Sequence, residues 1–364
     1  MHIAFAVTAH GLGHWGRSAA LIASLLEHDR KPSVSVSTGL SKAVVKGSFP
    51  GLFESRVRHR LADYEPGVAQ NNCIDIDAPG TVDLYRKFHD NRERRLADER
   101  AFLTRHRVDL VISDVPAIAV RAAADVGIPA VGVASFTWDW ILEPMLRGTR
   151  AEPVLDALRR DYGVGSKHFL LPFGCSCSPF PAVEAAPLLC RNASLGRGEA
   201  RQALGLPRLS SRPLLLICMG GWSGENLPAI RVRNTSDLDT VIIGGLGIAT
   251  DGPTIRLTHD LPGGLSVPDL IHAADLLVTK PGYGMAAEAY VHGTPVAFVE
   301  RLHFAETRAL MSVMADHPIA TLSRQEFEQG TWEQAFADLL GQRVPRRSND
   351  GARQIADAIL TTYC

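Results

Sequence analysis

The sequence predicts an α/β protein with two domains of parallel sheet, and three observations support this. Short apolar runs alternate with helical stretches along the chain, the pattern of parallel strands connected by helices. The length of 364 residues suits two domains, each able to bury its own core. Glycine-rich turns follow apparent strands near both ends, in Ala9–Arg17 and in Lys280–Gly284. Such a turn between a strand and a helix binds anions through backbone N–H groups and the helix N-terminus.

The first half of the chain contains a regular series of strands and helices. We expect buried strands at residues 3–7, 33–37, 110–114 and 129–133. We expect helices at residues 18–28, 82–107 and 116–126, the second as one long solvent-facing helix rich in Arg, Glu and Leu. Asp114 ends one of these strands, and ligands of open α/β sheets bind at that edge of the sheet.

The composition changes after this series, between Leu170 and Leu209. Prolines accumulate there at positions 172, 179, 181 and 187, and glycines at 174, 196, 198 and 205. This stretch is typical of a connection between domains. Beyond it we expect strands at residues 213–218, 240–243, 276–279 and 295–299, the last clear strand, and helices at 285–292 and 352–362.

The bulk composition excludes several classes of partner. The apolar fraction is 46% and the net charge is −1, so no basic face indicates nucleic acid and no polybasic run indicates a membrane surface. The six cysteines form no Cys-x-x-Cys pair, which disfavours zinc and indicates reduced thiols. The apolar start is too short for a signal sequence, and no run approaches the roughly 18 residues of a membrane span. We expect a cytoplasmic protein without integral membrane contact.

The segment from Pro268 to Ala309 is the most specific part of the sequence. A strand leads into the Lys280–Gly284 turn, a helix containing Glu288 follows, and Gly293-Thr294-Pro295 leads into the next strand. This order resembles the donor-nucleotide half of glycosyltransferases with the GT-B fold. The resemblance implies that Glu288 binds the ribose hydroxyls and that the turn holds the diphosphate through Lys280, Gly282, Tyr283 and Gly284. The alternative is a tight turn followed by a solvated glutamate.

Other segments resemble a narrower group, the bacterial GT-B-like transferases and the N-terminal region of plant L-arabinokinases. They are the first glycine turn, Asp109–Asp114, Val126–Val133, Ser135–Trp140, Pro187–Arg191 and the donor-side turn Gly220-Gly221. The resemblance implies two facing Rossmann-like domains with an interdomain cleft. It does not extend to the kinase domain of arabinokinases and so does not imply kinase activity. We expect an acceptor-binding domain at 1–185, a sugar-nucleotide-binding domain at 186–345, and a terminal helical segment at 346–364 that crosses back to the first domain.

His14 is the candidate catalytic base. In many inverting enzymes of this fold the base projects from the loop after the first strand, and an imidazole suits removal of a proton near neutral pH. His10 competes for this role, and the alternative for either histidine is a helix cap or a backbone hydrogen bond. Arg17 can pair with phosphate or with Asp114. Asp114 either orients the histidine or, as we favour, caps the helix that begins near Pro116.

The remaining candidates lie on the acceptor and donor sides. Gly11 and Gly13 complete the first turn, and Trp138 with Asp139 can form an acceptor pocket or pack between domains. On the donor side His303 and Glu306 stand where the resembling family usually has an Asp/Glu-Gln pair. Because that pair is absent, the sequence does not indicate which sugar the donor has. Asp75-Ile76-Asp77 imitates a metal-binding Asp-x-Asp, but we interpret it as a loop. Lys280 and helix N-termini already supply positive charge, so we expect no metal and no other cofactor.

The sequence therefore predicts a metal-independent glycosyltransferase, inverting with His14 as base. Its expected partners are a UDP-, dTDP- or GDP-linked sugar and a small hydrophilic acceptor, such as a sugar or natural product. One alternative is a sugar-nucleotide epimerase of the same fold. Another is a protein that binds sugar nucleotides without turnover. The sequence does not specify the oligomeric state.

Overall fold

A computed structural model describes residues 1–175, 177–221, 226–258, 260–302 and 304–363 of the chain. The chain divides into two compact units. Unit 1 comprises Met1–Ala69, Asp77–Leu189 and Asp350–Cys364. Unit 2 comprises Gln70–Ile76 and Cys190–Asn349.

Unit 1 contains a parallel sheet with the strand order β3-β2-β1-β4-β5-β6-β7. The order is that of a Rossmann-like sheet, with the chain reversing its direction of growth between β1 and β4. Its strands are β1 (His2–Val7), β2 (Ser33–Thr38), β3 (Val57–Leu61), β4 (Leu110–Asp114), β5 (Ala130–Ala134), β6 (Lys167–Leu170) and β7 (Val183–Ala185). Its helices are α1 (Leu12–Glu27), α2 (Lys42–Ser48), α3 (Ala78–Asp90), α4 (Arg92–Arg105), α5 (Ala117–Asp125), α6 (Trp138–Leu146), α7 (Pro153–Tyr162) and α14 (Gly351–Tyr363).

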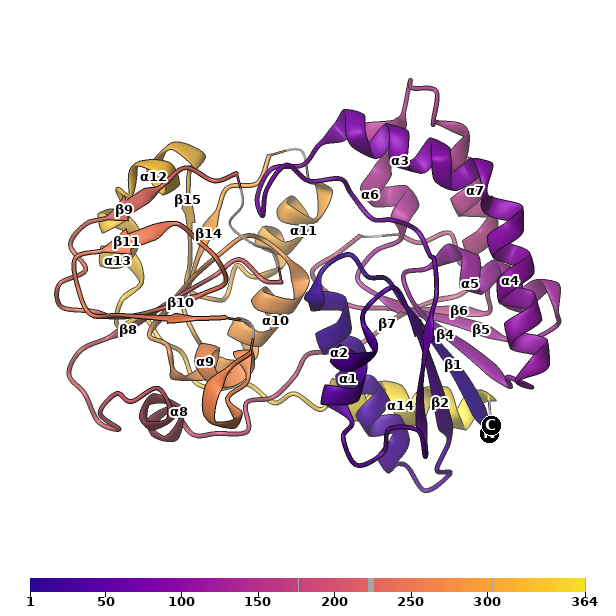
Figure 1. Ribbon diagram of the computed structural model, residues 1–364, viewed down its shortest axis with the longest axis horizontal. Helices are drawn as coiled ribbons and strands as arrows, with labels where there is room; N and C mark the ends of the chain where they lie inside the picture. The colour runs from indigo at the N-terminus through magenta and orange to yellow at the C-terminus, as the bar shows by residue number, and fades with distance from the viewer. Residues whose placement is uncertain (176, 222–225, 259, 303, 364) are drawn as a thin grey trace. The chain divides into compact units, whose positions relative to one another are not determined.

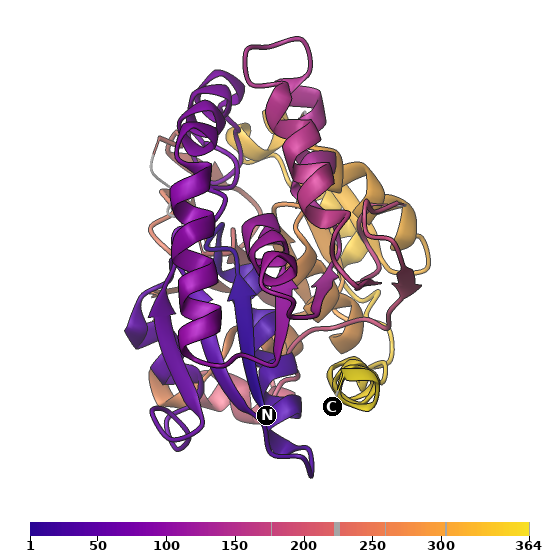
Figure 2. The same cartoon turned by 90° about the vertical axis from the view of Figure 1, so that its right-hand side faces the viewer.

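The helices of unit 1 cover both faces of its sheet, as parallel strands require, because their apolar side chains point to either side. The terminal helix α14 packs against α1, while α4 and α7 pack against α5 (Figure 1). β1, β4 and β5 are buried along most or all of their length, which gives the central strands their apolar sequences. Figure 2 shows unit 1 from the side on which α4 lies in front of the strands.

Unit 2 contains a second parallel sheet with the order β12-β10-β8-β13-β14-β15, and a short parallel pair, β11-β9. Its strands are β8 (Leu214–Cys218), β9 (Ile230–Val232), β10 (Asp239–Ile243), β11 (Ile248–Thr250), β12 (Thr254–Leu257), β13 (Leu276–Thr279), β14 (Val296–Val299) and β15 (Ile319–Leu322). Its helices are α8 (Arg197–Ala203), α9 (Val267–Ala273), α10 (Tyr283–His292), α11 (Ala305–Val313), α12 (Arg324–Gln329) and α13 (Glu333–Leu339), with a 3₁₀ turn at Pro262–Gly264.

The segment Gln70–Ile76 comes from the first half of the sequence but belongs to unit 2. Cys73 and Ile74 are buried in the core of unit 2, among side chains of β8, β13 and β14. Asp75 forms an ion pair with Arg324 at 2.9 Å. The chain therefore enters unit 2 briefly long before the main crossing after Leu189.

Three expected elements differ from the structure. The expected long helix at 82–107 is two helices, because Asn91, with φ −107° and ψ 9°, leaves the helical conformation between α3 and α4. The first helix begins at Leu12 rather than Ser18, which places His14 and Arg17 on it. The strand at 295–299 is followed by another, β15, whose short Ile-Ala-Thr-Leu sequence gives a weak signal. Within the described residues, no helix is long and apolar enough to cross a membrane.

Candidate functional site

The first turn of α1 brings three polar side chains to one buried position in unit 1. Gly11, the N-cap of α1, has φ 83° and ψ 167°, a conformation that favours glycine and lets the chain turn from β1 into the helix. His14, Arg17 and Ser18 stand three and four positions apart, so they share one face of α1. Gly13 lies exposed in the same turn.

Asp114, at the carboxyl end of β4, contacts all three side chains of this face. Its Oδ1 atom lies 3.0 Å from His14 Nδ1 and 2.5 Å from Arg17 Nη2. Its Oδ2 atom accepts hydrogen bonds from Arg17 Nε at 2.8 Å and from Ser18 Oγ at 2.7 Å. Arg17 Nη1 also donates to Ser135 Oγ, just after β5, at 3.1 Å. One carboxylate thus anchors α1 to the neighbouring strand ends.

This network overturns the expectation that Asp114 caps the next helix. Both of its oxygens are bonded to α1, and Pro116 is the N-cap of α5. The reason is the pairing of β1 with β4, in which Val7 lies opposite Asp114, so that the loop after β1 passes directly over the carboxylate. Of the two expected partners of Arg17, phosphate and Asp114, the structure shows the pairing with Asp114.

The electrostatics of the network keep Asp114 charged and His14 neutral. Burial by itself raises the pKa of Asp114, but the Arg17 guanidinium and His14 together hold that pKa far below its ordinary value. Burial, and then the charge of Arg17, lower the pKa of His14, against the opposing effect of Asp114. At neutral pH the His14 imidazole is therefore uncharged and one of its nitrogens has a lone pair.

His14 Nδ1 faces two groups of opposite character. It lies 3.0 Å from Asp114 Oδ1, which only accepts a hydrogen bond, and 2.8 Å from Arg17 Nη2, which only donates one. A proton on Nδ1 satisfies Asp114 and leaves the lone pair on Nε2. A proton on Nε2 leaves the Nδ1 lone pair for Arg17. The position of the proton on the imidazole therefore determines whether His14 Nε2 can accept a proton as a base or donate one as an acid.

His10, Trp138 and Asp139, the other residues predicted on the acceptor side, also belong to unit 1. The His10 ring is half-buried, and its centroid lies 5.8 Å from that of Trp138 in an edge contact. Trp138 is 0% exposed and also contacts Phe136, so in this structure its ring is packed inside unit 1. Asp139 is buried, and burial raises the pKa of its carboxyl; its Oδ2 atom lies 3.4 Å from Arg159 Nε.

The predicted diphosphate turn of unit 2 lies between β13 and α10. Gly282 is the N-cap of α10 and has an extended backbone, with φ −176°, that any residue can adopt. A Cβ atom at Gly282 would meet no described atom within 4 Å, so packing does not require glycine there either. Tyr283 is buried at the first position of α10, and Gly284 follows it half-exposed.

Glu288, one turn further along α10, is buried beside Arg191. Its Oε1 atom accepts a hydrogen bond from Arg191 Nε at 2.8 Å. Its Oε2 atom is buried and has no hydrogen-bond partner among the described residues. Burial raises the pKa of the Glu288 carboxyl, and the Arg191 charge opposes this effect. The alternative of a solvated glutamate is wrong for Glu288, since this side chain is buried.

Three charged residues surround the start of the turn. Burial, and then the nearby charge of Arg301, lower the pKa of Lys280 to about 7, against the effect of Glu306. Arg301 follows β14, donates from Nε to the Ile74 carbonyl at 3.0 Å and lies over the Phe304 ring. Glu306 is buried in the first turn of α11. His303, the other residue expected here, lies outside the described residues.

The remaining sequence candidates are also placed. Gly220 follows β8 with φ 74°, which favours glycine, and Gly221 is exposed beside it. Asp75 and Asp77 lie in a loop: Asp75 pairs with Arg324, and Asp77 Oδ1 accepts from the Gly80 backbone as the N-cap of α3. Across the described ranges, no group of three or more His, Cys, Asp or Glu side chains is placed to hold a metal ion.

Sequence reasoning missed four members of these two clusters. Ser18 and Ser135 complete the Asp114 network. A helix predicted to begin at Leu12 would have placed Ser18 on the same face as His14 and so indicated it. Arg191 and Arg301 were not assigned roles of their own. Arg301 has a usable signal, a cation just after a strand of a parallel sheet, whereas only the tertiary structure brings Arg191 to Glu288.

Comparison with known proteins finds a related sequence and many related structures. No family model matches the chain. The L-arabinokinase of Arabidopsis thaliana is 28% identical over 340 residues, which cover 91% of this chain. The chain spans only 31% of the length of that kinase.

Solved glycosyltransferase structures match the chain over nearly its whole length. A UDP-glucosyltransferase from Polygonum tinctorium that can glucosylate indoxyl has a TM-score of 0.60 at 12% identity, covering 100% of this chain and 93% of that one. UGT2 of Phytolacca americana, complexed with UDP-2fluoro-glucose and pterostilbene, has a TM-score of 0.61 at 15% identity, covering 100% and 94%. UGT89C1 of Arabidopsis thaliana, complexed with UDP, has a TM-score of 0.64 at 11% identity, covering 100% and 99%. The chain therefore has the GT-B fold of these proteins.

Proposed function

We propose that this chain is a glycosyltransferase that moves a sugar from a nucleotide-sugar donor to a hydroxyl of a small hydrophilic acceptor. The observation that supports it most is the buried His14–Asp114 pair at the carboxyl edge of the unit 1 sheet, in a fold shared with solved glycosyltransferases. A neutral histidine beside an ionised carboxylate suits the removal of a proton from an alcohol. Removal of the proton from the acceptor hydroxyl is the step of the proposed transfer that needs such a pair of side chains.

In the proposed reaction His14 Nε2 takes the proton of the acceptor hydroxyl. The acceptor oxygen forms a bond to the anomeric carbon of the sugar, and the bond from that carbon to the nucleotide diphosphate breaks. The diphosphate leaves with the electron pair, and attack from the opposite side inverts the configuration. Asp114 acts as a positioning residue, because its acceptance of the Nδ1–H keeps the lone pair on Nε2.

The donor is proposed to bind at the turn of unit 2. The backbone N–H groups that begin α10 follow the N-cap Gly282, where an added Cβ atom would meet no described atom within 4 Å, so a ligand has room to approach them. Lys280 and Arg301 supply positive charge for the leaving diphosphate, so the proposed reaction uses no metal. The unpartnered Glu288 Oε2 atom is a natural acceptor for a ribose hydroxyl, since a buried carboxylate oxygen without a partner is costly. The structures complexed with UDP and with UDP-2fluoro-glucose make UDP-sugars the first donors to test.

A binding experiment separates donor recognition from fold. Calorimetric titration with UDP-, dTDP- and GDP-sugars should give saturable binding of at least one donor. Glu288→Gln keeps the side-chain shape but removes the charge, and charge-assisted hydrogen bonds contribute about 1.5–3 kcal/mol, so Kd should rise about tenfold to a hundredfold. Glu326→Gln, which alters the capping box at the start of α12, is the control and should leave Kd unchanged. Absence of binding by every donor would overturn the proposal.

A further inference from the structure

One face of β2 and of the edge strand β3 in unit 1 is polar, whereas a packed sheet face is normally apolar. In the register of the sheet Ser35 of β2 pairs with Arg58 of β3, and Ser37 pairs with Arg60. Side chains two positions apart share a face, so these serines and arginines lie on the same side. Arg60 Nη1 lies 2.5 Å from Glu99 Oε2, which identifies this side as the one facing α4. The neighbouring β1 side chains there, Ala4 and Ala6, are small.

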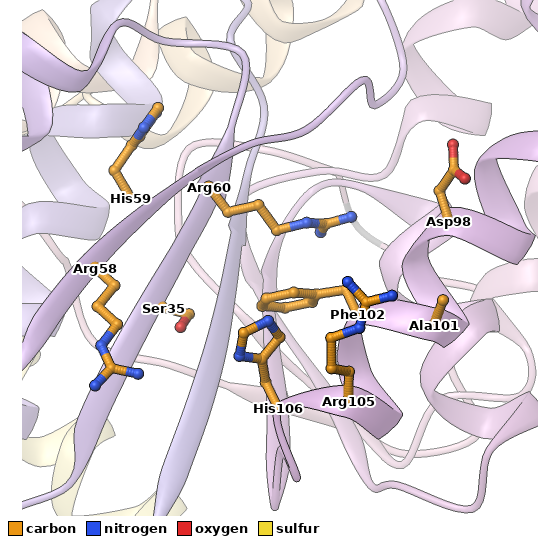
Figure 3. A pocket seen from close by; sticks show the side chains of 9 residues that line it. All are labelled: Ser35, Arg58, His59, Arg60, Asp98, Ala101, Phe102, Arg105 and His106. Atoms are coloured by element: carbon orange, nitrogen blue, oxygen red, sulfur yellow. The ribbon is translucent and has the colours of Figure 1, made fainter.

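A groove of about 500 Å³ occupies the space between this polar face and the end of α4. Figure 3 shows Arg58 on one side of Ser35, and Phe102, Arg105 and His106 of the helix end on the other. The Phe102 ring contacts two side chains of the groove: the Arg60 guanidinium lies 4.1 Å from its centroid, and the centroid of the His106 ring lies 4.9 Å from it. The volume is in the range of sites for small molecules.

The groove has positive charge that the protein does not neutralise. Arg60 pairs with Glu99, but neither Arg58 nor Arg105 has a carboxylate within ion-pair distance in the part of the chain that the structure describes. Asp98 lines the rim and lies 3.8 Å from Arg94. The positive charge of the groove affects the His106 imidazole. Burial lowers its pKa, and the charges of His2, Arg105, Arg58 and Arg60 lower that pKa further.

We propose that this groove binds the phosphate group of a small phosphorylated molecule. Arg58 and Arg105 stand on opposite sides of the groove and together supply two positive charges, the number that balances a phosphate monoester. Either guanidinium group can donate two parallel hydrogen bonds to phosphate oxygens. The His106 ring at the end of α4 offers a further donor when protonated. Every residue involved belongs to unit 1 and to neither the His14 network nor the donor turn, so the inference is independent of the proposed transfer reaction.

Calorimetry with glucose 6-phosphate and inorganic phosphate tests the site, with glucose as the uncharged control. We expect both phosphates, but not glucose, to bind saturably. Arg58→Ala and Arg105→Ala should each weaken Kd about tenfold to a hundredfold, as expected for a lost charge-assisted contact. Arg353→Ala, which removes an exposed arginine of α14, is the matched control and should leave Kd unchanged. Lys280→Gln should also leave it unchanged, which excludes binding at the donor turn.

The His106 ring provides a readout of the groove itself. Its NMR signals, assigned with His106→Gln, should shift on addition of glucose 6-phosphate, and a bound anion should raise its pKa. The proposal is overturned if neither phosphate binds saturably or if Arg58→Ala and Arg105→Ala bind as the wild type does. It is also overturned if vesicles of phosphatidylserine and phosphatidylcholine bind through these arginines while glucose 6-phosphate does not.

Discussion

The network around Asp114 predicts a large loss of stability in the variant Asp114→Asn. Asp114 is 1% exposed and Arg17 is 2% exposed, and they are joined by two hydrogen bonds of 2.8 and 2.5 Å. Asparagine keeps the shape but removes the negative charge that faces the buried Arg17 guanidinium, and breaking a buried ion pair in this way costs about 3–5 kcal/mol. Domains have total unfolding free energies of about 5–15 kcal/mol, so the effect should be large.

Denaturant unfolding monitored by circular dichroism measures this effect. Asp63→Asn is the matched control: its carboxylate also pairs with an arginine, Arg95, at 2.7 Å, but it is exposed and should cost at most about 1 kcal/mol. The double variant Arg17→Met with Asp114→Leu removes both charges and should recover much of the loss. If Asp114→Asn costs no more than Asp63→Asn, the buried pair does not stabilise α1 against β4 and the reasoning is refuted.

The Asp114–Arg17 pair also predicts how the loss of stability in Asp114→Asn changes with pH. The pKa of Asp114 in the folded protein is lowered, so its contribution is fully present above the unfolded pKa of about 3.9. The contribution is lost as the pH falls from there through the folded pKa. The difference between wild type and Asp114→Asn should therefore stay constant from about pH 5 to pH 8 and shrink at lower pH. A difference that grows on acidification would contradict this sign.

The other predictions concern the proposed reaction. His14→Ala should lower kcat by about 10²–10⁴ with donor Kd unchanged, and His10→Ala is the internal control. Nitrogen-15 NMR of the wild type should find the proton on His14 Nδ1. Full turnover by His14→Ala, or a proton on Nε2, would exclude His14 as the catalytic base. Because the pKa of Lys280 is about 7 and a bound diphosphate favours its charged form, donor Kd should be lowest below pH 7 and rise by up to about tenfold per pH unit above it. Lys280→Arg should abolish this rise, and a wild-type Kd that is constant from pH 6 to 8.5 would exclude Lys280 from the site. Gly282→Ala should leave the free energy of unfolding unchanged or raise it by about 0.4–1 kcal/mol while weakening donor binding; equal effects on both would mean that Gly282 serves the fold.

Local sequence determined most of the strands and the two glycine turns. Leu110–Asp114 and Leu276–Thr279 were predicted with the bounds that the structure has, because central strands of parallel sheets are short apolar runs ended by polar residues. The GT-B fold was likewise predicted from its motifs and is confirmed by the structural comparisons. Where the local signal was weak, as in β15 and at the break in the helix at Asn91, the prediction was wrong.

Only the tertiary structure decided what the polar side chains do. Ser113-Asp114-Val115-Pro116 suits a helix cap, yet the β1–β4 register places Asp114 against α1, about a hundred residues earlier in the chain, and its oxygens bond there. The same applies to Glu288, whose partner Arg191 is 97 residues away, and to Arg58, left without a partner on a polar sheet face. Local patterns report burial and backbone conformation, which neighbouring residues determine. The partner of a charge depends on which distant strands lie side by side, and that is fixed by packing of the whole unit.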